Sequence, residues 1–366
     1  MTSTEIYLEL LRAGLWNRPA VVCGPAKLRE VLDMALRQNT LPAVSKALLD
    51  RMGSRLPQHM QDMLQQNVQR CANANRTANS VIGYVNSTLA GLNIVPVLLK
   101  GQGIASWYPV PTVRQPGDID LYVRQFLPAR AALEQLFGPV TEEGGKHVTF
   151  HVGGTLYLEL HRYTETLDNA GQNAEYQRIS DIGTSSDLEP VNLDGATVNT
   201  PEPTFDAFYV FHHMWHHFSG MGIGLRQLCD WSMFLHSHKG RLDEARLSGM
   251  LDSFKLKDAW QVFGCAAVQA LDLPPEDVPF YDASKAKRGS KLVDFFLVQG
   301  DNRAFKHGRH GQSKLRHKGG SLRYIHRKLA QMFPIFPGKA LLLYVGDIKN
   351  GVLKLLKART PDLGGE

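Results

Sequence analysis

Two stretches decide the fold: VLLKGQG at residues 97–103 and GDIDLYV at residues 117–123. The first is the end of an apolar run followed by a lysine and two glycines, which is typical of a buried strand and a tight turn. In the second stretch Asp118, Asp120 and Tyr122 alternate with apolar residues, as on a strand with one buried face. We therefore expect two strands, the second with two carboxylates side by side.

The two aspartates point to metal chemistry. Residues at i and i+2 of a strand project from the same face, with roughly 6–7 Å between their Cα atoms. Hard divalent cations prefer carboxylate oxygens and share them with phosphate oxygens, and a third carboxylate completes many two-metal sites. Asp118 and Asp120 are therefore candidate catalytic and metal-binding residues for Mg²⁺ or Mn²⁺.

A hairpin downstream supplies the third carboxylate. Two alternating runs, 147–152 and 155–161, are separated by Gly153-Gly154, a strong hairpin signal. Glu159 and His161 fall on the same face of the second run. We expect Glu159 to complete the catalytic and metal-binding set, with His161 in the same cleft.

The turn after residue 99 is a candidate nucleotide-binding element. Glycines allow backbone N–H groups to approach a phosphate, and a lysine or arginine side chain nearby adds charge. The candidate nucleotide-binding residues are Lys100, Gly101, Gln102, Gly103 and Arg114.

Four histidines follow within one predicted helix, 205–218. His212 and His216 form one HxxxH pair, and His213 and His217 form another. This spacing can bind zinc, yet the neighbouring residues are apolar or aromatic, which favours a half-buried helix. A third interpretation has His213, His217 and Arg226 lining the cleft that holds the carboxylates.

The sequence predicts helices on both sides of these strands. Apolar residues at steps of three and four predict helices at 6–15, 28–36 and 57–89, and again at 128–137, 205–218, 225–236, 242–251 and 258–271. We expect an α+β fold, with a small mixed β-sheet core flanked by N- and C-terminal helical regions. The expected organisation is a helical region at 1–92, the α/β core at 93–200, a second helical region at 201–300, and a basic segment with a terminal helix at 301–366.

The net charge of +6 is unevenly distributed. Residues 302–346 contain ten lysines and arginines and no acid, which leaves the remainder of the chain at −4. Segment 303–328 is therefore a candidate polyanion-binding surface, although a solvated basic segment explains the same composition.

Four widely spaced cysteines without a CxxC pair predict buried thiols in a reducing compartment. The N-terminal residues lack a signal-peptide pattern, and no apolar run is long enough to span a membrane. These features predict a soluble, cytoplasmic protein.

Several of these motifs, in this order, resemble a family of uncharacterised bacterial nucleotidyltransferases of the polymerase-beta-like superfamily. The resemblance rests on LKGQGIA at 99–105, YP at 108–109, Arg114, GDIDLYV at 117–123, LELH at 158–161 and the region around His212, His213 and 225–230. It implies that Asp118, Asp120 and Glu159 form the metal-binding triad and that 101–103 lies at the triphosphate. The sequence departs from the superfamily in having Gly-Gln-Gly where a Gly-Ser turn is usual, and Glu as the third acid.

The function implied is Mg²⁺-dependent transfer of a nucleoside monophosphate from an NTP to an acceptor hydroxyl. The acceptor is open: a sugar, a small alcohol, a protein side chain or an RNA end. Two alternatives remain, a nucleotide-binding module without catalysis that acts as a sensor or partner protein, and an RNA-binding protein that uses the basic C-terminal segment.

Overall fold

The computed structural model describes residues 1–20, 27–219, 223–299, 329–330, 332–341 and 344. Within these residues a mixed sheet lies between helices on both faces, so the predicted α+β class is confirmed. The basic segment 303–328 and most of the predicted terminal helix lie outside the described residues.

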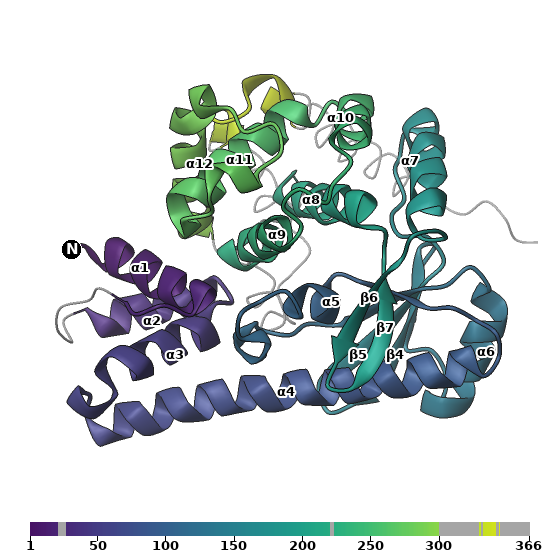
Figure 1. Ribbon diagram of the computed structural model, residues 1–366, viewed down its shortest axis with the longest axis horizontal. Helices are drawn as coiled ribbons and strands as arrows, with labels where there is room; N and C mark the ends of the chain where they lie inside the picture. The colour runs from purple at the N-terminus through teal and green to yellow at the C-terminus, as the bar shows by residue number, and fades with distance from the viewer. Residues whose placement is uncertain (21–26, 220–222, 300–328, 331, 342–343, 345–366) are drawn as a thin grey trace, which may run out of the picture.

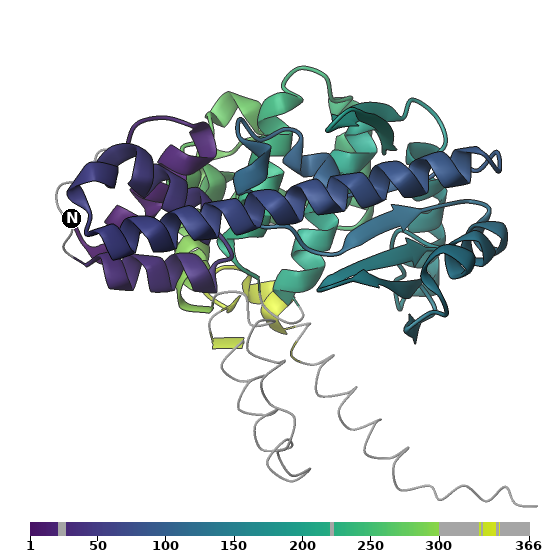
Figure 2. The same cartoon turned by 90° about the horizontal axis from the view of Figure 1, so that it is seen from below.

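The N-terminal region is helical, as predicted. Its helices are α1 (Ser3–Trp16), α2 (Leu28–Arg37), α3 (Leu41–Met52) and α4 (Gln58–Ala90). Thr2 begins α1 with a capping box, because its hydroxyl accepts from the Glu5 amide while the Glu5 side chain accepts from the Thr2 amide. Helix α4 runs from the N-terminal helices to the underside of the sheet and so joins the two parts (Figure 1, Figure 2).

The sheet has the strand order β3-β4-β5-β2-β1-β7-β6. Its strands are β1 (Val97–Leu99), β2 (Ile119–Tyr122), β3 (Glu142–Glu143), β4 (His147–Gly153), β5 (Leu156–His161), β6 (Glu189–Leu193) and β7 (Ala196–Thr200). β1 is antiparallel to β2 and parallel to β7, and β2 is parallel to β5, so the sheet is mixed. The predicted hairpin is confirmed as β4 and β5, which pair antiparallel.

Strand alternation separates an apolar face from a polar face. Ile119, Leu121, Leu158 and Leu160 join one buried cluster with residues of α4 and of α6 (Phe126–Phe137). The residues between them, including Asp120 and Glu159, therefore lie on the opposite face. The site thus faces the C-terminal helices rather than α4.

The C-terminal helices form a second body above that polar face (Figure 1). They are α8 (Pro203–Ser219), α9 (Leu225–Ser237), α10 (Glu244–Ser253), α11 (Lys257–Leu271) and α12 (Ala286–Gln299). Aromatic side chains fill their core: Phe211 packs edge-on against Trp260 and Phe263, and Trp231 against Trp260. The remaining labelled α-helices are α5 (Gly101–Ala105) and α7 (Ala170–Gly183), and the described residues 337–341 are also helical. Short 3-10 helices lie at Gly53–Arg55, Pro111–Val113, Pro275–Asp277 and Ala283–Lys285.

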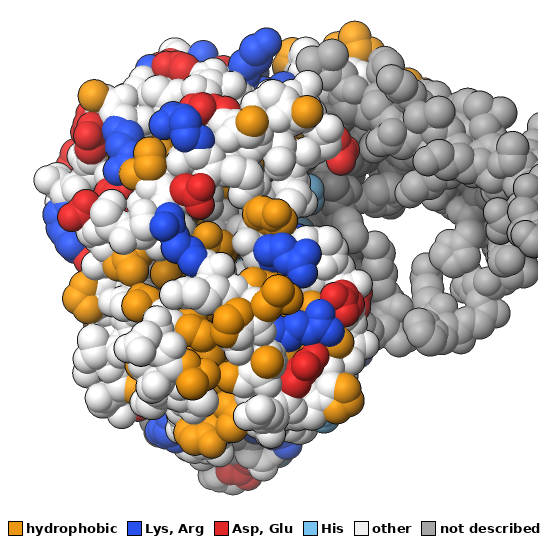
Figure 3. Space-filling view, turned by 90° about the vertical axis from the view of Figure 1, so that its right-hand side faces the viewer, with side chains coloured by type: hydrophobic (Ala, Val, Ile, Leu, Met, Phe, Trp, Pro, Cys, Tyr) orange, Lys and Arg blue, Asp and Glu red, His pale blue; other side chains and the backbone are white. Residues whose placement is uncertain are grey.

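Among the described residues, no helix combines the length and the apolar character that a membrane crossing requires. On the face beyond the end of the sheet, hydrophobic side chains gather with lysines and arginines among them (Figure 3).

Three of the predicted buried thiols, Cys71, Cys229 and Cys265, are buried and free, and Cys23 lies outside the described residues.

Candidate active site

Three neighbouring strands bring the predicted carboxylates together. In the β2–β5 register Asp120 lies beside Glu159, and in the β1–β2 register it lies beside Leu99. Asp118 immediately precedes β2 and is exposed, whereas the Asp120 side chain is only 12% exposed. All three acids line one cleft with a volume of about 410 Å³.

Lys100 contacts the central carboxylate directly. Its Nζ lies 3.2 Å from Asp120 Oδ1, and its backbone has a φ of 53°, which is uncommon outside glycine. Burial raises the pKa of Asp120, but the Lys100 charge and the hydrogen bond with His161 outweigh burial and hold that pKa well below its usual range. Asp120 is therefore held as a carboxylate.

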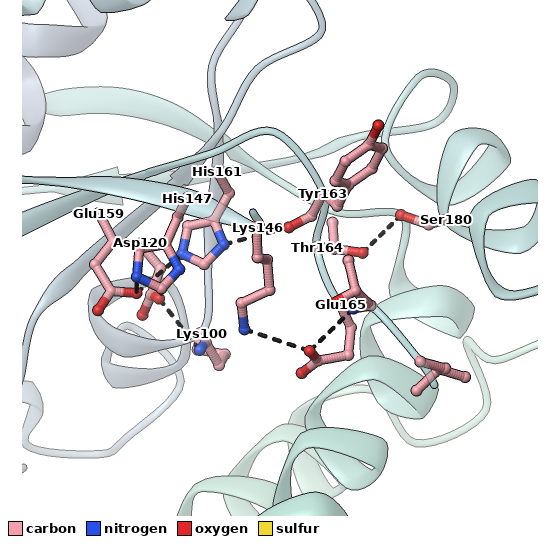
Figure 4. Close-up of polar contacts among 12 residues, drawn as sticks. Lys100, Asp120, Lys146, His147, Glu159, His161, Tyr163, Thr164, Glu165 and Ser180 are labelled. Carbon is pink, nitrogen blue, oxygen red and sulfur yellow. Dashed lines mark hydrogen bonds and ion pairs between the residues drawn. The ribbon is translucent and has the colours of Figure 1, made fainter. Parts of the chain in front are cut away.

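His161 contacts two of the acids, which lie on the same side of its ring (Figure 4). Its Nε2 is 3.0 Å from Asp120 Oδ1 and 3.2 Å from Glu159 Oε2, and its Nδ1 faces the Tyr163 carbonyl at 3.4 Å. Burial lowers the pKa of His161, but the hydrogen bonds to Asp120 and Glu159 raise it above its usual value. His147 approaches from β4, with Nε2 at 3.7 Å from Glu159 Oε2.

The three residues of the turn after β1, Gly101, Gln102 and Gly103, face different parts of the molecule. Gly101 has a φ of 47° and borders the cleft. The Gln102 side chain is buried and donates to Asn75 Oδ1 and Asn79 Oδ1 of α4. Gly103 packs on β7, where an added Cβ would lie 2.8 Å from Thr200 Cγ2. The side chain of Gln102 thus anchors the turn to α4, and Gly103 permits close packing.

Arg114 is held by a carboxylate of the chain itself. Its Nε and Nη2 donate to Asp230 Oδ1 and Oδ2 at 2.7 and 2.9 Å, and the Tyr108 hydroxyl donates to Asp230 Oδ1 at 2.6 Å. The third guanidinium nitrogen, Nη1, is buried without a hydrogen-bond partner among the described residues, and Arg114 and Asp230 both line the cleft. Arg114, a candidate nucleotide-binding residue, therefore directs two of its guanidinium nitrogens to Asp230 of α9.

The C-terminal helices form the opposite wall of the cleft. His213 and His217 of α8 line it with their rings 4.4 Å apart, as does Arg226 of α9, whose Nη1 donates to the Gln115 carbonyl. His212 is instead buried against Tyr176, Phe208 and Phe254. The two HxxxH pairs therefore differ, since His213 and His217 face the cleft and His212 belongs to the core.

Sequence reasoning missed three residues of the site. Lys146 and His147 line the cleft at the start of β4, and Lys146 Nζ lies 3.4 Å from Glu165 (Figure 4). The hairpin signal contained His147, but a regular two-residue Gly153-Gly154 turn would place it opposite Leu160. The register shift between His151 and Gly153 places it opposite His161 instead. Asp230 ends the 225–230 stretch that carries the resemblance, but its pairing with Arg114, which is 116 positions away in the chain, left no local signal.

The mixed sheet and its carboxylate-lined cleft define a nucleotidyltransferase-like α+β protein. The chain belongs to the family described as uncharacterised nucleotidyltransferases, whose model matches residues 24–270. The crystal structure of an antigenic nucleotidyltransferase-like protein from Paracoccidioides brasiliensis is similar over 57% of this chain and 95% of its own, at 13% identity and a TM-score of 0.34. No curated protein matches the chain.

Proposed function

We propose that this chain is a Mg²⁺- or Mn²⁺-dependent nucleotidyltransferase of the bacterial, polymerase-beta-like type. It would transfer a nucleoside monophosphate from an NTP to an acceptor hydroxyl. The observation that carries the proposal is the lateral pairing of Asp120 with Glu159, next to Asp118 and Lys100, in a cleft of about 410 Å³. Membership of the nucleotidyltransferase family supports it.

The donor set fits a hard divalent cation. Asp118, Asp120 and Glu159 supply carboxylate oxygens, and Asp120 is kept ionised by Lys100 and His161. When bound, such a cation neutralises phosphate charge and helps to orient the attacking and leaving oxygens.

The remaining residues would position the triphosphate. Gly101 allows close approach of the backbone to a phosphate because it borders the cleft and carries no side chain. Lys100 supplies a positive charge at the same edge, and Arg226, His213 and His217 supply donors from the opposite wall. Catalysis would then depend on positioning and on charge neutralisation.

Glu159 would accept the proton of the acceptor hydroxyl. The acceptor oxygen forms a bond to the α-phosphorus as the bond between that phosphorus and the bridging oxygen breaks, and pyrophosphate leaves. The acceptor would be a sugar, a small alcohol, a protein side chain or an RNA end, held between the sheet face and helices α8 and α9.

Nucleotide binding without transfer is the second candidate function. It is favoured by Gln102, which stands where the superfamily usually has serine and whose side chain is engaged by Asn75 and Asn79. A serine hydroxyl for phosphate is therefore lacking in this turn.

The test compares NTP binding in Mg²⁺ or Mn²⁺ and then pyrophosphate release across a panel of acceptors. Asp118→Asn and Asp120→Asn should each lose metal-dependent NTP binding, while Asp168→Asn, which makes the same charge change on an exposed residue outside the cleft, should bind like wild type. Equal binding by all four proteins would disprove the site. Binding by wild type without pyrophosphate release from any acceptor would favour the non-catalytic alternative.

A further inference from the structure

A cluster of nitrogen and oxygen ligands lies beside the aspartate pair. His147 of β4 is directly opposite His161 of β5 in the antiparallel register, and Glu159 lies two residues before His161 on the same face. One ligand atom from each of these three residues lies within 4.8 Å of the other two. The described part of the chain contains no other group of three such residues that meets this criterion.

The spacing fits a small divalent ion. Glu159 Oε2 is 3.2 Å from His161 Nε2 and 3.7 Å from His147 Nε2. Ligands bound tetrahedrally at about 2.0–2.1 Å lie about 3.4 Å from one another, so these separations need only small side-chain adjustments.

The outer contacts of the histidines are consistent with ligation. The Nδ1 of His161 faces the Tyr163 carbonyl, which orients the ring so that Nε2 points at the two carboxylates. A backbone carbonyl on the second nitrogen is the usual support of a metal-binding histidine. His147 Nδ1 is buried without a hydrogen-bond partner among the described residues, so the chain does not fully satisfy this ring.

We propose that His147, Glu159 and His161 bind one transition-metal ion, with Zn²⁺ as the first candidate. Two imidazoles and one carboxylate favour borderline ions such as Zn²⁺ over Mg²⁺, which prefers oxygen ligands alone. His147 and Glu159 line the cleft, so the ion has its open coordination position on the cleft side, next to Asp120. This site is additional to the aspartate pair Asp118 and Asp120, although it shares Glu159 with the donor set proposed above and His161 also contacts Asp120.

The binding test needs neither nucleotide nor catalysis. Tag-free protein, freed of metal by chelation, is titrated with Zn²⁺ by calorimetry in a buffer containing 1 mM Mg²⁺, and bound zinc is counted after dialysis. Wild type should bind one Zn²⁺ per chain. His147→Ala and His161→Gln should each weaken binding at least about tenfold, because each removes one of three protein ligands.

Matched variants separate this site from the other histidines. His151→Ala removes an exposed imidazole from the same strand and should bind Zn²⁺ like wild type. His213→Ala tests the α8 pair across the cleft and should also bind like wild type. Circular dichroism and thermal melting establish that each variant is folded, and His147, which is partly exposed, is the variant least affected by packing loss.

Three results would overturn the proposal: no Zn²⁺ bound by folded wild type, undiminished binding by folded His147→Ala, or a loss confined to His213→Ala. Failure of Zn²⁺ binding leaves the transferase proposal intact, since that proposal is tested by Asp118→Asn and Asp120→Asn in Mg²⁺ and NTP. Loss of NTP binding in those variants with Zn²⁺ retained would equally show two separable sites.

Discussion

Arg114 and Asp230 form an ion pair that is almost wholly removed from water, with side chains 4% and 9% exposed. Two parallel N–H···O bonds and the Tyr108 hydroxyl give the carboxylate three hydrogen bonds. Such a pair contributes modestly to stability when intact, but the loss of one partner leaves a buried charge uncompensated. Because the pair joins the segment before β2 to α9, it fixes one wall of the cleft against the other.

We expect Asp230→Ala to lower the free energy of unfolding by about 3–5 kcal/mol, because Arg114 would keep its charge without a partner. Urea denaturation followed by circular dichroism measures this change. The control is Glu175→Ala, which breaks the exposed pair with Arg178 and should leave the unfolding free energy almost unchanged. Similar decreases in unfolding free energy for Asp230→Ala and Glu175→Ala would contradict the prediction that breaking the buried ion pair costs more than breaking the exposed one.

His212 offers a pH-dependent prediction away from the carboxylates. Burial lowers its pKa to about 4, while the neighbouring Glu165 acts in the opposite direction and His216 in the same one. The unfolded chain binds a proton at this histidine below about pH 6.5, whereas the folded chain does so only below about pH 4, so stability rises with pH in that window. This one residue should therefore remove about 3 kcal/mol of stability between pH 7 and pH 4.

His212→Phe keeps an aromatic ring among Tyr176, Phe208 and Phe254 and removes the titrating nitrogen. Unfolding free energies measured at several pH values between 4 and 7 should show a smaller acid loss than in wild type. The same substitution at exposed His151 should retain the wild-type slope. If the unfolding free energy of His212→Phe depended on pH as steeply as that of wild type, His212 would not be the source of the acid loss.

At the level of elements, the close contact between α5 and β7 explains why residue 103 is a glycine. A Cβ at Gly103 would lie 2.8 Å from Thr200 Cγ2 and 3.7 Å from Leu98 Cδ2. We expect Gly103→Ala to lower the unfolding free energy by about 1–3 kcal/mol, because one of these buried groups must shift. Thermal or urea unfolding measures the loss.

A second substitution tests the cause. Thr200→Ser removes the clashing methyl group and keeps the hydroxyl that donates to the Glu189 carbonyl, so it should recover part of the loss in a double-mutant cycle. As a control, Gly249→Ala in α10, where an added Cβ meets nothing within 4 Å, should stabilise the protein by about 0.5–1 kcal/mol. If the effects of Gly103→Ala and Thr200→Ser on the unfolding free energy were simply additive, a clash with the Thr200 methyl group would be excluded.

The elements that were predictable have strong local signals. Steps of three and four apolar residues predicted α4, which ends at Ala90 before Gly91, and the Gly153-Gly154 turn predicted the β4–β5 hairpin. Helices α3, α7 and α12 and the strands β3, β6 and β7 were missed. The Asp194-Gly195 turn between β6 and β7 is itself a hairpin signal, and both of these residues have positive φ.

The candidate site was predictable only along single strands. Alternation placed Asp118 with Asp120, and Glu159 with His161, on common faces, and the structure brings these pairs together. The contacts of Lys100 with Asp120 and of Arg114 with Asp230 depend on how distant elements pack, so no local pattern contained them. Spacing alone likewise did not distinguish the buried His212 from the cleft-lining His213.

At the scale of the whole molecule, charge is separated along the chain. Residues 302–346 carry ten lysines and arginines without an acid, while the remainder, which contains the carboxylate cleft, sums to −4. A net charge of +6 is thus no evidence that the remainder of the chain binds polyanions. Any such binding is expected to reside in segment 303–328, which lies outside the described residues.

We expect deletion of 303–328, which removes nine of those ten cations, to abolish most of the affinity of the chain for RNA. Each lysine or arginine that neutralises a phosphate of single-stranded RNA contributes about 0.7 to the slope of log affinity against log salt, so the slope should fall by several units. Fluorescence anisotropy with a labelled single-stranded RNA between 50 and 300 mM salt measures both quantities. Mg²⁺-dependent NTP binding should be unchanged in the deleted chain, because the cleft residues lie elsewhere. An RNA affinity and a salt slope equal to those of the full chain would place polyanion binding elsewhere in the chain instead.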